Sequence, residues 1–247
     1  MTIAFPVYLK LPVRFSHGDV METKIIVIRH CEARGNIDRI FNGHFDGDIT
    51  ENGEKQLACL AERLKKVSFD AIYSSPLLRA RKTAMAANTG KNLPIQLEEG
   101  LIEINGGVWE GKPWKSFPEL FPKDSEAWNL RPWDFAPEDG ETMRSVYERI
   151  WRTVTGLARR NAGKTICCVS HGCAIRNLLC RAKGYPIEKL NDVQWCDNTA
   201  VSILSFDENF HGKLLLENDN SHLSADLSTL AGQVWWRKEY RDRMIFE

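Results

Sequence analysis

The 247-residue sequence lacks several features that would place it in a specialised class of protein. It carries no net charge, with 33 Lys and Arg against 33 Asp and Glu, so no global field favours nucleic acid or an anionic membrane as a partner. It has no apolar run near the roughly 20 residues needed to span a bilayer, and no internal repeats or low-complexity tracts. The length and the 43% hydrophobic content predict one or two domains with a large buried core.

The cysteines also lack a recognisable pattern. Seven occur at irregular spacings, Cys167 and Cys168 are adjacent, and there is no C-x-x-C pair. This usage predicts reduced thiols and a cytoplasmic protein. A zinc site built from His30, His44, His171 and nearby cysteines is disfavoured because no metal-ligand spacing supports it, and no metal is expected.

Three short β-prone runs predict buried strands of an α/β sheet, at residues 24–28, 70–73 and 165–169. Polar side chains follow each run: Arg29 and His30 after the first, Arg79 after the second and His171 after the third. Open α/β sheets bind ligands just outside the carboxyl ends of their strands. We therefore expect these four side chains in one crevice. The alternative is three separate strand ends with solvated charges.

Helix starts are expected beside these side chains. Ser75 followed by Pro76 predicts a hydroxyl cap with proline in the first turn, and a helical pattern begins after His171. Arginine side chains and free backbone N–H groups at a helix start together form a phosphate site. The two histidines indicate that the protein also performs chemistry on the phosphate.

The segments between the motifs alternate between helical and strand patterns. We expect helices over 50–66, 79–89 and 141–160, and later strands over 200–204 and 213–216 near a sheet edge. Strand, helix and strand joined by short links predict a three-layer α/β/α sandwich with a mainly parallel sheet.

Residues 109–137 form an insertion that is too rich in proline for one long helix and too aromatic for a disordered linker. Its aromatic residues are Trp109, Trp114, Phe117, Phe121, Trp128, Trp133 and Phe135. Residues 1–20 have no apolar signal region, so we expect a dispensable extension and, in a bacterial source, a translation start at Met21. The tail 223–247 is expected to be helical, either packed on the domain or forming a homodimer contact.

Five motifs follow one another over roughly residues 24–206, at 29–36, 41–57, 74–80, 101–111 and 170–172. In order, they resemble the RHG motif, the G-x-x-D…L-T-x-x-G-x-x-Q stretch, the second arginine motif, the acid motif and the second histidine motif of the histidine phosphatase superfamily. That superfamily includes cofactor-dependent phosphoglycerate mutases and many phosphatases. The order of the five motifs makes the resemblance specific, although each motif alone is weak.

One position departs from the family pattern, because Cys31 stands where the RHG motif has glycine. A neighbouring histidine and cysteine also suggest the H-C-x5-R loop of cysteine-dependent phosphatases, in which a thiolate attacks phosphorus. That loop requires an arginine six residues after the cysteine, and Ile37 occupies the position here. The thiolate mechanism is therefore disfavoured.

The resemblance implies a role for each motif residue. His30 would attack phosphorus and become a phosphohistidine, while Glu103 would protonate the leaving oxygen and then activate water. The residues that would clamp the phosphoryl group or bind substrate are Arg29, Arg79, His171, Asn36, Asn42, Gly43 and Gly172. The insertion would cap the active site. No metal or other cofactor is implied, because arginine and histidine supply the positive charge.

The sequence favours a phosphatase over a mutase. In the family, mutases carry Arg-His directly after the catalytic glutamate and an arginine pair in the insertion. Here Ile104 and Asn105 follow Glu103, and the insertion contains the single Arg131. We therefore predict hydrolysis of a small phosphomonoester with an uncharged or apolar body. A phosphoglycerate mutase-type transfer and a non-catalytic phosphate-binding regulatory module are the alternatives, and the second is disfavoured because no catalytic position is lost.

Overall fold

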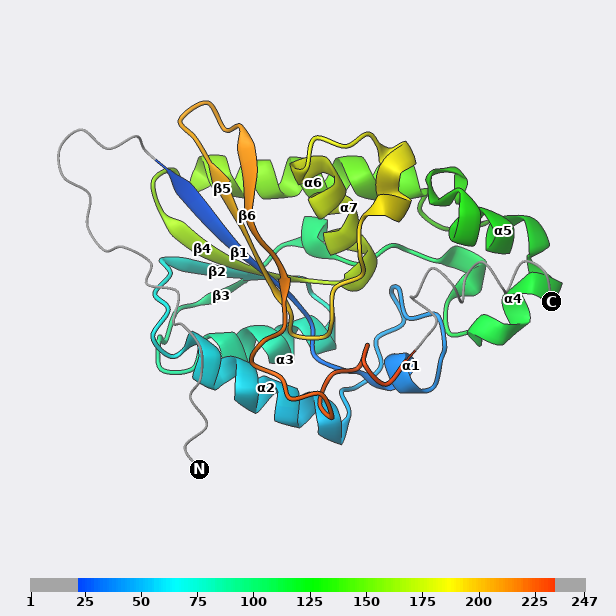
Figure 1. The fold of residues 1–247 in the computed structure, drawn as a ribbon, viewed down its shortest axis with the longest axis horizontal. Helices are drawn as coiled ribbons and strands as arrows, with labels where there is room; N and C mark the ends of the chain where they lie inside the picture. The colour runs from blue at the N-terminus through cyan, green and yellow to red at the C-terminus, as the bar shows by residue number, and fades with distance from the viewer. Residues whose placement is uncertain (1–21, 234–247) are drawn as a thin grey trace.

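A six-stranded sheet forms the centre of the computed structural model, which describes residues 22–233 (Figure 1). Its strands are β1 (Thr23–Arg29), β2 (Ala71–Ser74), β3 (Ile95–Leu97), β4 (Thr165–Ser170), β5 (Val201–Phe206) and β6 (Gly212–Asp219). They lie in the order β3-β2-β4-β1-β5-β6. The first four are parallel to one another, whereas β5 pairs antiparallel with both of its neighbours, β1 and β6. The predicted mainly parallel sheet is confirmed. β6 lies at the edge as expected, but β5 lies inside the sheet.

Helices cover both faces of this sheet, as the predicted three-layer sandwich requires. Helices α2 (Glu51–Leu64) and α3 (Leu78–Ala87) lie on one face, and α6 (Met143–Arg160) and α7 (Gly172–Ala182) lie on the other (Figure 1). Alternate side chains of β1 serve the two cores: Ile26 and Ile28 pack with α2 and α3, while Ile25 and Val27 pack with α6 and α7.

The predicted helix starts are partly correct. The Thr50 hydroxyl accepts a hydrogen bond from the Gly53 N–H at 2.9 Å and caps α2 as expected. The expected cap at Ser75 is wrong, because α3 begins at Leu78 and the residue before it is Leu77. The Ser75 hydroxyl is instead used in the site described below.

The aromatic insertion folds into short elements whose buried aromatic side chains belong to the same hydrophobic core as α6 and α7. They are η2 (Gly107–Trp109), η3 (Trp114–Ser116), α4 (Phe117–Leu120), α5 (Pro122–Leu130) and η4 (Pro132–Asp134). Proline stands in the first turn of α4, α5 and η4, where its missing N–H costs nothing. Trp109 stacks on Phe117 with ring centroids 3.8 Å apart, and Phe135 packs against the edge of Trp109. All three are buried.

The segment after β6 runs past α2 toward the short helix α1 (Arg34–Ile37) (Figure 1). Residues 223–233 form turns and no helix, so the helix predicted for the tail is wrong over this stretch. The rest of the predicted tail and the 1–20 extension lie outside the described residues. The remaining elements are η1 (Glu99–Leu101) and η5 (Ile187–Asp192). We call residues 227–233 the strap.

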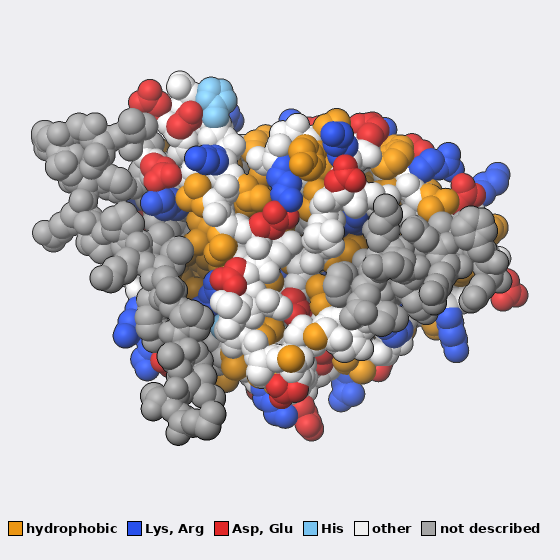
Figure 2. Space-filling view, in the orientation of Figure 1, with side chains coloured by type: hydrophobic (Ala, Val, Ile, Leu, Met, Phe, Trp, Pro, Cys, Tyr) orange, Lys and Arg blue, Asp and Glu red, His pale blue; other side chains and the backbone are white. Residues whose placement is uncertain are grey.

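The surface in view carries charges of both signs, with Lys and Arg interspersed among Asp and Glu (Figure 2). None of the helices described between residues 22 and 233 is both long and apolar enough to cross a membrane.

Candidate active site

A pocket open to solvent, with about 720 Å³ of empty space, lies at the carboxyl ends of the parallel strands. Seven of the nine predicted site residues line it: Arg29, His30, Asn36, Asn42, Gly43, Glu103 and Gly172. The other two, Arg79 and His171, are fully buried and do not line the pocket. The sequence thus predicted residues that gather at this pocket but did not distinguish the pocket wall from the buried side chains beneath it.

The imidazole of His30 is held in the form that a nucleophile needs. Its Nδ1 lies 2.6 Å from the carbonyl oxygen of Cys31, and a carbonyl only accepts, so Nδ1 carries the proton and Nε2 keeps its lone pair. The ring makes no other hydrogen bond within the described residues. Burial lowers the pKa of His30 well below its usual value, and the nearby Arg79 and Arg29 lower the pKa further. His30 is therefore neutral at pH 7.

The second histidine packs beside the first. The rings of His30 and His171 have their centroids 5.1 Å apart. Nε2 of His171 lies 2.7 Å from Oγ of Ser75, and its Nδ1 is buried without a partner. Burial lowers the pKa of His171 well below its usual value, with Arg79 as the next cause. Ser75 thus fixes the orientation of His171 instead of capping α3.

Several buried polar atoms at this place have no partner. Nη1 of Arg29 donates to the Cys196 carbonyl at 2.6 Å, and the Nη atoms of Arg79 donate to main-chain carbonyls of residues 42–45. The Nε atoms of both arginines are left without an acceptor, and both amide atoms of Asn42 are unpaired. Unpaired buried donors are costly. Their grouping is suited to an anion with several oxygen atoms.

The carboxylate of Glu103 lies on the N-terminus of α7. It accepts backbone hydrogen bonds from Ile104, Cys173 and Ala174, each 2.9 Å long. The carboxylate of Asp46 accepts similarly from the first N–H of α3, that of Leu78. The expectation that these helix starts offer free N–H groups to phosphate is therefore wrong for these N–H groups, because two carboxylates already occupy them.

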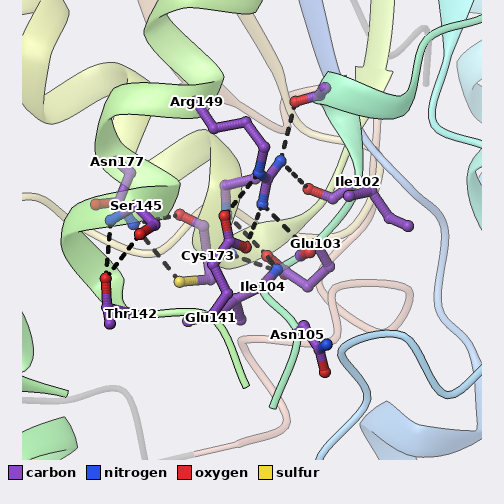
Figure 3. A network of polar contacts seen from close by, with 12 residues as sticks. Ile102, Glu103, Ile104, Asn105, Glu141, Thr142, Ser145, Arg149, Cys173 and Asn177 are labelled. Carbon is purple, nitrogen blue, oxygen red and sulfur yellow. Dashed lines mark hydrogen bonds and ion pairs between the residues drawn. The ribbon is translucent and has the colours of Figure 1, made fainter. Parts of the chain in front are cut away.

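Arg149 binds the main chain at and before Glu103 (Figure 3). Its guanidinium forms a two-armed ion pair with Glu141 and donates to the carbonyl oxygens of Gly100 and Ile102, at 3.0 and 2.9 Å. A longer contact of 3.4 Å reaches the carbonyl of Glu103 itself. The role of Arg149 could not be predicted from the sequence, where its only signal is an arginine on an amphipathic helix.

The two predicted glycines stand where backbone atoms pass close to other groups. A Cβ at Gly43 would lie 2.2 Å from the carbonyl oxygen of Ile104, and one at Gly172 would lie 3.2 Å from Nε of Arg29. Asn36 uses its Oδ1 to accept from the N–H of Ala33 at 3.0 Å. Roles for these three residues in substrate binding stay predictions.

Cys31 is buried, and its backbone N–H donates to Oγ1 of Thr83 at 2.9 Å. Burial raises the pKa of its thiol to about 11, so the thiolate is scarce at neutral pH. All seven cysteines fall within the described residues and none forms a disulfide. Over the same residues, no group of three or more His, Cys, Asp and Glu is arranged to hold a metal ion.

Part of the pocket wall was also not predicted from the sequence. Trp195 lines the pocket together with the insertion residues Trp114 and Trp128, and its ring stacks near Trp128 at 6.3 Å between centroids. The strap contributes Thr229, Leu230 and Gln233 to the wall. No local pattern in the sequence connects these late residues to the motifs.

The fold and the site define an α/β sandwich with paired histidines and arginines at the carboxyl ends of its parallel strands. A family model described as the histidine phosphatase superfamily (branch 1) matches residues 25–220. The chain therefore belongs to this superfamily, as its motifs indicated, and is a histidine phosphatase.

Two curated relatives and one solved structure illustrate the similarity. Phosphoserine phosphatase 1 of Hydrogenobacter thermophilus is 33% identical over 75% of this chain and 87% of its own length. The adenosylcobalamin/alpha-ribazole phosphatase of Escherichia coli is 30% identical over 68% of this chain and 82% of its own. The structure of Bacillus stearothermophilus YhfR has a TM-score of 0.78 and 31% identity, covering 82% of this chain and all of that one.

Proposed function

We propose that the protein is a metal-independent phosphomonoester hydrolase that forms a phosphohistidine at His30 and acts on a small organic phosphate. The observation that carries the proposal is the group of unpaired buried donors on Arg29, Arg79 and Asn42 around a neutral histidine. Donors fixed before the substrate arrives stabilise the charge of a transferring phosphoryl group without reorganising. Arg79 and His171 would act from the layer of side chains beneath the pocket.

The reaction has two steps. In the first, the Nε2 lone pair of His30 attacks phosphorus, the ester P–O bond breaks, and Glu103 gives its proton to the leaving oxygen. In the second, the Glu103 carboxylate takes a proton from water, the water oxygen attacks phosphorus, and the P–N bond breaks. Phosphate leaves, and His30 and protonated Glu103 are restored.

The pocket wall supports a substrate whose organic part is uncharged. Its ionisable residues are Arg29, His30, Arg39, Glu103 and the buried Cys173, and three of its other residues are Trp114, Trp128 and Trp195. The relatives named for phosphoserine and alpha-ribazole are consistent with a small organic phosphate. A wall with three indoles favours an apolar or planar body.

Hydrolysis of p-nitrophenyl phosphate, followed by a panel of sugar, nucleotide and amino-acid phosphates, tests the proposal. We expect phosphate release that persists after chelator treatment and is lost in His30→Ala. Transfer between phosphoglycerates without phosphate release would support the mutase alternative. Phosphate binding without turnover of any ester would support the regulatory module.

A further inference from the structure

Two buried carboxylates that the reaction does not use hold the strap, residues 227–233. Glu32 is 3% exposed, and its carboxylate accepts from Oγ1 of Thr50 at 2.6 Å, Nδ2 of Asn52 at 3.1 Å and Oγ1 of Thr229 at 2.8 Å. Gln56 adds to the same junction by donating from Nε2 to the Leu227 carbonyl at 2.8 Å. Among residues 22–233, neither the Glu32 carboxylate nor that of Asp197, the second of the two, forms an ion pair.

The second carboxylate is Asp197, also 3% exposed. It accepts from the hydroxyl of Ser228, the backbone N–H groups of Leu230 and Asn198, and Nδ2 of Asn220. A buried charge without a cation is costly unless hydrogen bonds satisfy its oxygen atoms. Because the strap supplies two of the four donors to Asp197 and one of the three to Glu32, its displacement would leave both charges undersatisfied.

The residues around Asp197 also hold the loop that carries Arg29 and His30. Nδ2 of Asn198 donates to the His30 carbonyl at 2.8 Å, and the N–H of Thr199 donates to the Arg29 carbonyl at 3.1 Å. The Cys196 carbonyl accepts from the Arg29 guanidinium. One short turn therefore fixes the strap on one side and Arg29 and His30 on the other.

The strap faces the pocket with neutral side chains. Thr229, Leu230 and Gln233 line it, and Nε2 of Gln233 donates to the Asn36 carbonyl at 3.2 Å. We propose that the strap is the wall that recognises the uncharged organic part of the substrate, and that Glu32 and Asp197 are the residues that position it relative to His30. The inference rests on the proposed phosphatase function. It assigns the residues that would bind the leaving group, which is the organic part of the substrate.

Binding measurements separate this inference from the proposed function, because they need no turnover. The probes are inorganic phosphate, which occupies only the phosphoryl site, and benzylphosphonate, which adds an uncharged aryl body and cannot be hydrolysed. Calorimetric Kd values are compared for wild type, Thr229→Val, Asp197→Asn and Leu230→Ala. The matched control is Thr155→Val, which removes a buried hydroxyl bonded only within α6.

We expect the three variants to raise the Kd of benzylphosphonate by roughly fivefold or more, the equivalent of one lost hydrogen bond or apolar contact. In Thr229→Val and Leu230→Ala the Kd of inorganic phosphate should stay within about twofold, and the control should change neither Kd. Leu230→Ala still tests the role of the strap if loss of an anchoring hydrogen bond unfolds the chain, since the Leu230 side chain binds neither carboxylate.

Equal weakening of both probes by Thr229→Val and Leu230→Ala, or no change in benzylphosphonate binding by Leu230→Ala, would overturn the role of the strap. A wild-type protein that binds neither probe would instead count against the phosphatase proposal itself.

Discussion

The guanidinium of Arg149 binds the main chain that carries Glu103, through the carbonyl oxygens of Gly100 within η1 and of Ile102 directly after it, and through the carbonyl of Glu103 itself. Glu141 fixes that guanidinium with a two-armed ion pair. Glu103 is therefore held at two points. Its side chain accepts hydrogen bonds from the start of α7, and its backbone is bound by Arg149 of α6. An acid that must protonate a leaving oxygen benefits from such fixed placement.

Replacing Arg149 tests this arrangement. Arg149→Lys keeps the charge but loses the planar fork, so we expect kcat for alkyl phosphates to fall roughly tenfold. KM should change little, because Arg149 does not line the pocket. Steady-state kinetics measure both constants. Arg152→Lys, at an exposed position on the same helix, is the control, and an increase confined to KM would contradict a positioning role.

Glu103→Gln tests the acid role directly. The amide cannot donate the proton that an alkoxide leaving group requires, so turnover of alkyl esters should slow by about 10²-fold or more. Esters with good leaving groups, such as p-nitrophenyl phosphate, should slow far less. The ratio of the two rates is the measurement, with Glu119→Gln in an exposed part of the cap as the control. A uniform loss on both substrates would show that Glu103 only shapes the site.

Two neighbouring substitutions identify the nucleophile. His30→Ala should abolish turnover and remove any acid-labile, base-stable phosphoenzyme. Cys31→Gly restores the usual residue of the motif and should keep activity within roughly tenfold. Because burial raises the pKa of the Cys31 thiol to about 11, alkylating reagents should react with it slowly. A phosphoenzyme that survives in His30→Ala but not in Cys31→Gly would restore the thiolate mechanism.

Features encoded by neighbouring residues were predictable from the sequence. The apolar runs predicted β1, β2 and β4. The polar residues that follow these runs predicted that Arg29 and His30 lie in one pocket. Ser75 illustrates the limit of such local rules. Its hydroxyl and the following proline fit a helix cap, yet tertiary structure uses that hydroxyl for His171.

Long-range hydrogen bonds were not predictable in this way. Glu32 and Thr229 are 197 residues apart in the chain, and neither lies in an apolar pattern whose period reveals a partner. Arg149 binds carbonyl oxygens, which every residue carries, so the sequence gives no sign of its targets. The part of the pocket wall that the strap forms depends on such long-range hydrogen bonds.

Two aromatic residues of the insertion should respond differently to substitution. Phe117 is 1% exposed and stacks on Trp109, so Phe117→Ala should lower the free energy of unfolding by about 3–5 kcal/mol. Trp114 is half-buried and lines the pocket, so Trp114→Ala should raise KM unequally across substrates with a smaller loss of stability. Denaturant unfolding and a substrate panel measure the two effects. Unchanged substrate ratios in Trp114→Ala would make Trp114 a packing residue.

The pH dependence of stability should reveal His222, which lies beside the strap. Nη1 of Arg63 donates to its Nδ1 at 2.8 Å, so Nε2 carries the proton and contacts Oγ1 of Thr199 at 3.0 Å. Burial, aided by Arg63, lowers the pKa of His222 from 6.5 to about 4, although Asp219 and Asp197 oppose the shift. The ring is therefore neutral in the folded protein and protonates more readily in the unfolded chain.

Because the unfolded state binds this proton first, the stability contributed by neutral His222 is complete above pH 6.5 and declines as the pH falls toward about 4. His222→Gln keeps one acceptor and one donor but cannot titrate. We expect wild type to lose more unfolding free energy than this variant between pH 7.5 and pH 5, measured by urea denaturation. His30 and His171 titrate in both proteins, so the difference between the two isolates His222. Parallel stability curves would show that the ring does not stay neutral in the fold.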